Sequence, residues 1–329
     1  DDQLNSNSYY ELSTMYNFSN HDEQLKTLLN LEIENLSPKE KIYFCYSKSN
    51  AYHNNKDYKK SAYFLKIAND EKLKIQPSDL KKKLNTGEYF RNLKIDQNLN
   101  FEKVKDSNQY LFIVGMPRCG STLLESILSL NPEVKDLGEV PFLEESLQKS
   151  DDLLEVRKLY KEKVMLVNSK QKTFTDKNLF NFLYCPIIYR FFPNAKIIHC
   201  IRNPLDNILS IYRTNFLNQS FSSSLNDISD LYLYHLKLMK EYKSKFGSII
   251  YSYDHEQVVR NPKETIQDLI NWLDWEWNEK YLSPQKSKRS VFTASSAQVR
   301  KKINPNSSGC WKKYEDLLEP ISELFPKYN

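Results

Sequence analysis

Residues 115–122 have the types and spacing of a site for a phosphate-like anion. They read GMPRCGST, follow a short run of β-forming apolar residues at 110–114, and precede leucines at helical spacing. A strand, a tight loop bounded by glycines and a helix N-terminus direct several backbone N–H groups and the positive end of a helix dipole at one point. The sequence therefore predicts an anion-binding loop, with an ordinary strand-to-helix turn as the alternative.

The loop differs from an NTP-hydrolysing P-loop in its cation. Gly115 and Gly120 have the spacing of G-x-x-x-x-G-K-[ST], but Ser121 stands in the place of the Lys, and the cation of the loop is Arg118. A later strand ends in Arg202, where a Mg²⁺-dependent NTPase is expected to place Asp. Both departures favour a metal-independent phosphate site, and a P-loop nucleotide kinase stays as an alternative.

Two further candidates for chemistry follow other predicted strands or turns. Glu139 comes after Gly138 and directly before a predicted helix, and Lys177 comes two residues after the strand predicted at 172–175. Ligands of open α/β sheets bind at the carboxyl ends of the strands, so both side chains are expected to face the same opening. The alternatives are a helix-dipole partner for Glu139 and a solvated loop residue for Lys177.

Arg202 and Ser210 form a second candidate set for a phosphate. Arg202 ends the strand predicted at 196–201, and Ser210 lies eight residues later in a helix that begins near Pro204. Both contact one phosphate only if the ligand lies along the face of this helix. A solvated Arg and a Ser on the helix surface are the alternative.

An alternation of strands and helices from residue 110 onward positions these residues. It is typical of βαβ units, so we predict an α/β fold with a P-loop-like parallel sheet flanked by helices. The predicted strands are 110–114, 172–175, 196–201 and 248–253, and the predicted helices are 121–130, 140–149, 151–168, 179–192, 204–213, 226–246, 262–274 and 311–325.

The N-terminal part of the chain is predicted to be an all-helical accessory segment at 1–100, followed by a sheet domain at 101–329. Residues 39–69 carry two amphipathic stretches around a turn at 53–57, with small and aromatic residues spaced as in a tetratricopeptide unit. One such unit cannot be confirmed by periodicity, so a plain helical hairpin is an equal alternative.

Composition limits the partners and the compartment. The net charge of +5 over 329 residues suits an anionic small ligand or an acidic partner and is too small to indicate nucleic acid. No apolar run has membrane-spanning length and no signal-peptide pattern is visible. The five scattered cysteines lack C-x-x-C spacing, which favours reduced thiols in a cytoplasmic protein. We predict no metal, no nucleic acid and no membrane partner.

Over roughly residues 105–325 the chain resembles sulfotransferases that use 3′-phosphoadenosine 5′-phosphosulfate, in particular the bacterial tetratricopeptide-repeat enzymes and the tyrosylprotein sulfotransferases. Residues 117–122 match the 5′-phosphosulfate loop P-R-[ST]-G-[ST]-T of that family. Arg202, Pro204 and Ser210 match its 3′-phosphate motif R-x-P-x-x-x-x-x-S. The G-E pair, the D-K pair and the S-x-x-Q-V run of the family are matched at 138–139, 176–177 and 295–299.

The resemblance implies in-line, metal-independent transfer of a sulfuryl group from that donor to an acceptor hydroxyl. It implies Glu139 as the base and Lys177 as the cation on the sulfuryl group. The donor-binding residues that it implies are Arg118, Cys119, Gly120, Ser121, Thr122, Arg202, Ser210, Ser295 and Lys301. The acceptor is a peptide tyrosine, a glycan or a small molecule, and a homodimer is a further candidate assembly. A helical-repeat scaffold with a non-catalytic nucleotide-binding domain stays open.

Three positions depart from the family pattern. Cys119 stands where Ser is common, which changes a side chain of the loop but not its N–H groups. His255 stands where the family often has a Tyr against the adenine. Cys310 precedes Trp311 where a basic residue is usual, so one phosphate contact is either absent or supplied by Lys301, Lys302 or Lys312.

Overall fold

The computed structural model describes residues 5–15, 23–93, 107–167, 170–287, 303 and 308–326. Its contacts divide the chain into two compact units. We call them the helical unit (residues 1–83, 203–232 and 307–329) and the sheet unit (residues 84–202 and 233–306). The domain boundary predicted near residue 100 falls among residues outside the described ranges, so it stays a prediction.

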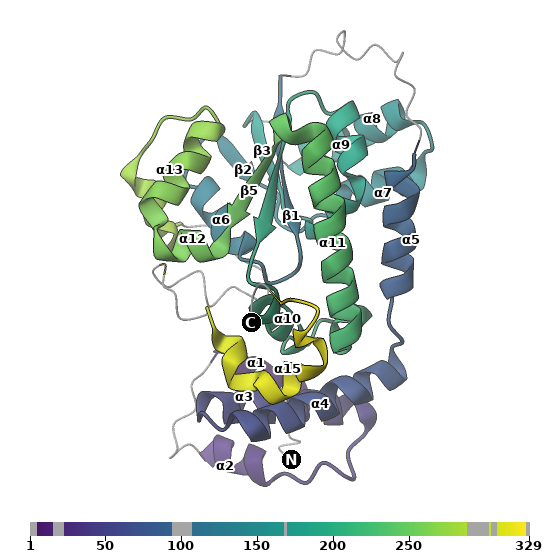
Figure 1. Ribbon diagram of the computed structural model, residues 1–329, viewed down its shortest axis with the longest axis vertical. Coiled ribbons are helices and arrows are strands. Elements are labelled where there is room, and N and C mark those ends of the chain that lie inside the picture. Colours follow the sequence, from purple (N-terminus) through teal and green to yellow (C-terminus); the bar gives the residue numbers. More distant parts are fainter. Residues whose placement is uncertain are drawn as a thin grey trace. The chain divides into compact units, whose positions relative to one another are not determined.

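The sheet unit is built on a five-stranded parallel sheet (Figure 1). The order is β2-β3-β1-β4-β5, and every neighbouring pair is parallel, which confirms the predicted α/β fold. The strands are β1 (Gln109–Gly115), β2 (Val134–Asp136), β3 (Thr173–Asp176), β4 (Ala195–Ile201) and β5 (Ile250–Asp254). The prediction omitted β2, because three residues are too few for a period-2 pattern to show.

Helices cover both faces of this sheet. Figure 1 shows α6, α12 and α13 on one side and α7, α8 and α9 on the other. Their bounds are α6 (Ser121–Leu128), α7 (Phe142–Lys149), α8 (Leu153–Val167), α9 (Cys185–Phe191), α12 (His255–Arg260) and α13 (Pro262–Trp272). Short 3₁₀ turns η2 (Leu179–Tyr184), η4 (Gly247–Ile249), η5 (Glu279–Leu282) and η6 (Pro284–Lys286) connect them. The helix predicted at 179–192 is thus divided into η2 and α9, and the short helix α12 was not predicted.

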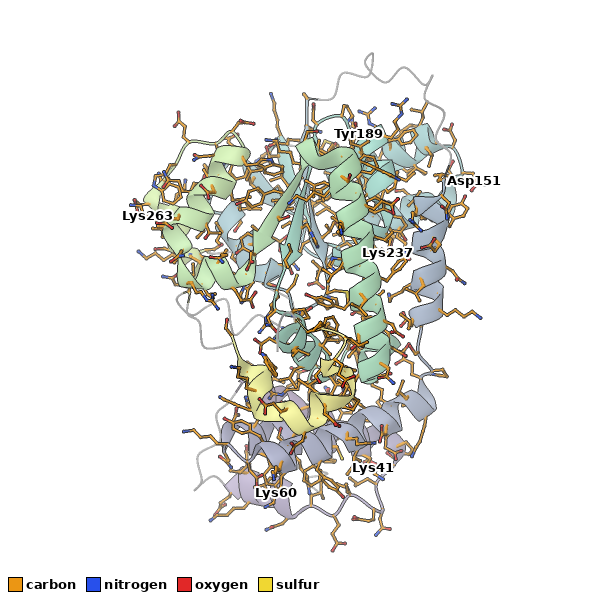
Figure 2. All side chains as sticks on the ribbon, in the orientation of Figure 1. Lys41, Lys60, Asp151, Tyr189, Lys237 and Lys263 are labelled. Carbon is orange, nitrogen blue, oxygen red and sulfur yellow. The ribbon has the colours of Figure 1, made fainter. Side chains whose placement is uncertain are left out.

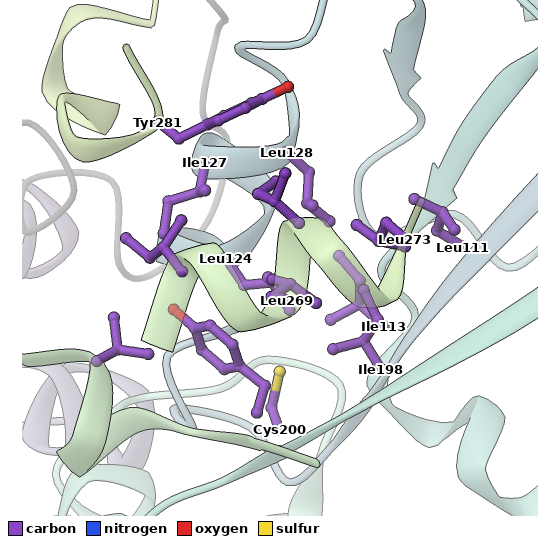
Figure 3. Close-up of a cluster of buried hydrophobic side chains, with 14 of the residues drawn as sticks. Leu111, Ile113, Leu124, Ile127, Leu128, Ile198, Cys200, Leu269, Leu273 and Tyr281 are labelled. Atoms are coloured by element: carbon purple, nitrogen blue, oxygen red, sulfur yellow. The ribbon is translucent and has the colours of Figure 1, made fainter. Parts of the chain in front are cut away.

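The side chains of β1 alternate between the two layers, as the pleat of a strand requires. Leu111 and Ile113 join a buried cluster with apolar side chains of α6 and α13, such as Leu124 and Leu269 (Figure 3). Tyr110 and Phe112 contact the ring of Tyr160 in α8, with ring centroids 5.6 and 5.7 Å apart. Because both faces are covered, the strand reads as an unbroken apolar run.

The helical unit is formed by segments from three parts of the chain. Its helices are α1 (Ser6–Met15), α2 (Glu23–Asn30), α3 (Pro38–Asn54), α4 (Tyr58–Ile75), α10 (Pro204–Tyr212) and α15 (Glu315–Ser322), with 3₁₀ turns η3 (Ser220–Ser223) and η7 (Cys310–Tyr314). Two further helices, α5 (Leu80–Arg91) and α11 (Leu225–Phe246), have residues in both units. The helix predicted at 311–325 is divided into η7 and α15.

The predicted helical pair at 39–69 is confirmed as the hairpin of α3 and α4. A capping box of Ser37 and Glu40 starts α3, and the Asp57 side chain accepts the N–H of Lys60 to start α4. The C-terminal segment packs on this hairpin, since the Tyr314 hydroxyl lies 2.8 Å from the Ser61 hydroxyl. The identity of the hairpin as a tetratricopeptide unit stays a prediction.

Charged side chains lie on the outer faces of the helices in both units. Lys60 in α4 and Lys263 in α13 have side chains that are each 61% exposed, and both are labelled in Figure 2. Throughout the described ranges, each helix is too short or too polar to cross a membrane. The five cysteines are free thiols, and the cytoplasmic location stays a prediction.

Candidate active site

Two glycines let the loop between β1 and α6 lie against its neighbours. Gly115 has φ +151°, and a Cβ added to it would lie 2.7 Å from the carbonyl oxygen of Cys200 on β4. Gly120 has φ +93°, and a Cβ there would lie 2.5 Å from Nδ1 of His255. Both distances are shorter than real Cβ contacts, so neither position has room for a side chain. The loop therefore lies directly on β4 and on the start of α12.

Arg118 occupies a strained backbone conformation in this loop. Its φ of +67° is in the left-handed region, which non-glycine residues adopt rarely and at a cost of ~1–3 kcal/mol. Its carbonyl oxygen accepts a hydrogen bond from Nη1 of Arg202 at 2.9 Å, and Arg202 is itself 91% buried at the end of β4. The structure thus brings the two predicted arginines together at one loop. Strain of this kind concentrates at binding sites.

The start of α6 has the character of an anion-binding helix terminus. Gly120 is its N-cap in the left-handed conformation and offers no side-chain acceptor to the first turn. Cys119, Ser121 and Thr122 are all buried around it. Burial alone would raise the pKa of the Cys119 thiol. Hydrogen bonds with Cys200 and with the Ser121 backbone and hydroxyl, together with the Arg202 charge, hold that pKa below its usual value.

The predicted base and the predicted cation meet on neighbouring strand ends. The backbone N–H of Leu137 donates to Thr175 and that of Lys177 donates to Gly138, both at 2.9 Å, which extends the pairing of β2 and β3 beyond the strands. This pairing sets Glu139 beside Lys177, and Nζ of Lys177 donates to Oε1 of Glu139 at 2.7 Å. The Glu139 side chain is 53% exposed, whereas the Lys177 side chain is fully buried. The pair therefore presents one accessible carboxylate held by one enclosed cation.

Asp176 fixes the turn that carries Lys177. Its Oδ1 accepts the backbone N–H of Asn178 at 3.0 Å and the side-chain amide of Asn181 at 3.1 Å, and its Oδ2 accepts the hydroxyl of Tyr160 at 3.1 Å. Burial raises the pKa of Asp176 to about 7, although the hydrogen bonds from the Asn178 backbone and the Tyr160 hydroxyl oppose the rise. Asp176 is thus an anchor for the backbone of this turn.

Glu125 is a buried carboxylate at the site that the sequence analysis missed. It lies in α6, and its Oε2 is 3.8 Å from Nζ of Lys177. Its other oxygen accepts hydrogen bonds from the Gly138 N–H and the Thr175 hydroxyl, each at 3.2 Å. A signal was present in the sequence, since Glu125 is the one charged residue in the helix STLLESIL. A charged residue on a buried helix requires a partner.

His255 is the first residue of α12, and its ring lies against Gly120. Burial, with a smaller contribution from the Arg202 charge, lowers the pKa of His255 to about 3. The imidazole is therefore neutral near pH 7 and adds no positive charge to the loop. His255 stands where the family often has a Tyr against the adenine, and the effect of this difference on adenine binding stays a prediction.

The described structure does not test the placement of three predicted donor-binding residues at this site. Ser210 lies in α10 of the helical unit while Arg202 belongs to the sheet unit, so their common phosphate contact stays a prediction. Ser295 and Lys301 lie outside the described residues. Among the residues that are described, no three His, Cys, Asp or Glu side chains are grouped so as to hold a metal ion.

Comparisons with known proteins agree on one family. A family model described as "Sulfotransferase family" matches residues 110–162 and 143–279. An uncharacterized protein of Aquifex aeolicus (strain VF5) is 32% identical over 245 residues, which are 66% of this chain and 32% of that protein. A protein-tyrosine sulfotransferase of Drosophila melanogaster is 24% identical over 254 residues, which are 66% of this chain and 50% of that protein. The chain thus spans about a third of the first relative and half of the second.

Among solved structures, the sulfotransferase domain from the Synechococcus PCC 7002 olefin synthase is similar to this chain. The likeness covers 67% of this chain and 96% of that domain, at 19% identity and a TM-score of 0.47. At this level it carries no argument about the site, and the fold rests on the parallel sheet itself.

Proposed function

The chain belongs to the sulfotransferase family, and we propose that it transfers a sulfuryl group from 3′-phosphoadenosine 5′-phosphosulfate to an acceptor hydroxyl. The observation that carries the proposal is the contact of 2.7 Å between Lys177 and Glu139. It sets an accessible carboxylate and a buried cation together, and Glu125 connects this pair to the helix that follows the anion-binding loop.

The loop and its neighbours have the groups that the donor requires. Arg118 and the backbone N–H groups of residues 118–122 would hold the 5′-phosphosulfate. Arg202 and Ser210 would hold the 3′-phosphate, and Ser295 and Lys301 would complete the donor site. Two observations support this assignment. The Arg202 guanidinium donates a hydrogen bond to the Arg118 carbonyl, and no side chain of the N-cap residue Gly120 accepts the N–H groups in the first turn of α6.

In the reaction, the acceptor oxygen forms a bond to sulfur while the bond between sulfur and the bridging oxygen of the donor breaks. Glu139 takes the proton of the acceptor hydroxyl, a role that its half-exposed side chain suits. Lys177 stabilises the charge that develops on the bridging and sulfuryl oxygens. The leaving group is adenosine 3′,5′-bisphosphate. Alignment of the reacting groups and electrostatic stabilisation supply the rate, as in phosphoryl transfer.

The acceptor is proposed only as a class, a hydroxyl group. Peptide tyrosine is one candidate, since a relative is a protein-tyrosine sulfotransferase. Glycan and small-molecule hydroxyls present the same O–H to Glu139, so all three classes belong in the test.

Radiolabelled sulfate transfer tests the proposal. The chain is incubated with labelled donor and a panel of tyrosine peptides, glycans and small phenols and alcohols, and calorimetry measures binding of adenosine 3′,5′-bisphosphate and of ADP. We expect label in at least one acceptor class, and tighter binding of the bisphosphate than of ADP. Equal binding of the two nucleotides, or consumption of ATP with Mg²⁺ and no label transfer, would contradict the proposal and favour a nucleotide kinase.

A further inference from the structure

Lys177 is a buried cation between two carboxylates that differ in exposure. Its side chain is 0% exposed and contacts Glu139 at 2.7 Å and Glu125 at 3.8 Å. Glu139 is 53% exposed, whereas Glu125 is fully buried. Only Glu139 is thus open to an acceptor, and Glu125 faces Lys177 from inside the protein.

Glu125 also joins the parts of the backbone that carry the reacting pair. Its Oε1 accepts the N–H of Gly138, which precedes Glu139, and the hydroxyl of Thr175, which lies two residues before Lys177. Its Oε2 is the atom that faces Lys177. One side chain of α6 therefore contacts the turn after β2, the end of β3 and the buried ammonium group.

The proposed reaction removes one of the two negative charges beside Lys177. When Glu139 takes the acceptor proton, its carboxylate becomes neutral. An ammonium group that is buried without a counter-ion is costly, and it then tends to lose its proton or its position. A second carboxylate that does not react keeps Lys177 charged and in place through this step.

We propose that Glu125 is a positioning residue, the permanent counter-ion of Lys177 that allows Glu139 to act as the base. This inference rests on the proposed function. Glu125 does not touch the substrate; it acts through Lys177 and through the Gly138 N–H. With Glu125, the proposed site includes a buried residue of α6 in addition to Glu139 and Lys177.

A stability cycle tests the charge pairing without any assay of activity. The melting temperatures of Glu125→Gln, Lys177→Met and the double variant are compared with that of the wild-type protein. Glu125→Gln leaves the buried Lys177 with one carboxylate contact fewer, and Lys177→Met leaves Glu125 buried without its cation, so each single variant is expected to melt at least ~2 °C lower. The double variant is expected to recover part of the loss, because the cation that needs Glu125 is gone. If the loss of melting temperature in the double variant equals the sum of the losses in the two single variants, the inference is overturned.

Thr175→Val is the matched control for a purely structural role. It removes the hydroxyl that donates to Glu125 and leaves all the charges in place. Thr175→Val is expected to lower the melting temperature by the same amount in the wild-type protein and in the Lys177→Met variant. Recovery of the same size as for Glu125→Gln would show that packing around Glu125, and not its charge, explains the cycle.

Measurements of kcat then distinguish the effect of the Glu125 charge from that of its side-chain shape. Glu125→Asp keeps the charge and shortens the side chain, while Glu125→Gln keeps the shape and removes the charge. We expect the Gln variant to lose up to ~10²-fold in kcat with unchanged binding of adenosine 3′,5′-bisphosphate, and the Asp variant to lose less. The opposite order would assign Glu125 a packing role. A wild-type chain that transfers no sulfate would overturn the proposed function as well, whereas an active wild type with a fully active Gln variant overturns only this inference.

Discussion

The two units bury lysines in different ways. In the helical unit, Lys48 donates to the backbone carbonyl of Leu29 at 3.2 Å, and Lys72 donates to the side chain of Asn215 at 3.0 Å and to the carbonyl of Phe216. In the sheet unit, Lys177 is held by the carboxylates of Glu139 and Glu125.

Neutral acceptors satisfy the hydrogen bonds of an ammonium group but do not balance its charge. Burial accordingly lowers the pKa of Lys48, and it lowers the pKa of Lys72 to about 8. The hydrogen bonds of Lys48 and Lys72 connect separate segments of the helical unit. Lys177, which is held between charges, is suited to stabilise the negative charge that develops in a reaction. The two units thus differ in the partners of their buried lysines, which are neutral acceptors for Lys48 and Lys72 and carboxylates for Lys177.

The largest expected difference is in turnover between Lys177→Met and Lys72→Met. Loss of Lys177 would remove the charge that we propose lies at the sulfuryl group, and it is expected to lower kcat by ~10²–10³-fold. Loss of Lys72 is expected to leave kcat unchanged at temperatures where the variant is folded. Steady-state assays with a saturating donor make the measurement. Equal losses in both variants would remove the distinction between the two lysines.

Arg202→Ala is expected to weaken binding of adenosine 3′,5′-bisphosphate. The variant removes the guanidinium group that we propose holds the 3′-phosphate. It also removes the hydrogen bond to the carbonyl oxygen of Arg118, the loop residue with a left-handed backbone. A hydrogen bond of this kind contributes ~1.5–3 kcal/mol, which corresponds to roughly a 10–150-fold higher Kd by calorimetry. Arg91→Ala, which breaks the ion pair of 2.8 Å with Glu241, is the control and should leave the Kd unchanged. An unchanged Kd in Arg202→Ala would refute the assignment.

Gly120→Ala is expected to destabilise the sheet unit and to reduce donor binding. The added Cβ would lie 2.5 Å from the His255 ring, and the left-handed φ of +93° strains any L side chain, so a cost of ~1–3 kcal/mol is expected. Gly247→Ala is the matched control, because its Cβ meets nothing within 4 Å. Urea unfolding of both variants makes the comparison. If the two glycines tolerate Ala equally well, the loop is not held as described.

The smallest expected effect is a pH dependence that Lys72 contributes to stability. Its folded pKa of about 8 lies below the ordinary lysine pKa of 10.5, so the unfolded chain binds more protons between these values. Stability from this residue therefore rises as the pH increases from about 8 to 10.5. The difference in unfolding free energy between the wild type and Lys72→Met should follow this trend. A difference that is independent of pH would mean that Lys72 is not buried as a charge.

Local patterns in the sequence were enough to predict four of the five strands of the sheet and most of the helices around them. Proximity of Glu139 and Lys177, which are 38 residues apart, followed from topology, because parallel strands end at one edge of the sheet. Their roles stay predictions, because a chain without donor or acceptor does not test them.

What the sequence did not reveal depends on contacts between distant segments. Glu125 is the one charged residue of its helix, but its partners at Gly138, Thr175 and Lys177 become visible only when β2 and β3 are placed beside α6. The strand β2 and the helix α12 are too short for periodicity to indicate them. The backbone strain at Arg118 has no signature in the sequence at all.

The central claim is that the pair of Glu139 and Lys177 performs the chemistry while the loop at 115–122 binds the donor. Single-turnover transfer of radiolabelled sulfate by Glu139→Gln, with calorimetry of adenosine 3′,5′-bisphosphate binding on the same protein, tests it most directly. If Glu139 is the base, the transfer rate falls by ~10²–10⁴-fold with an unchanged Kd. A transfer rate near that of the wild type would contradict it.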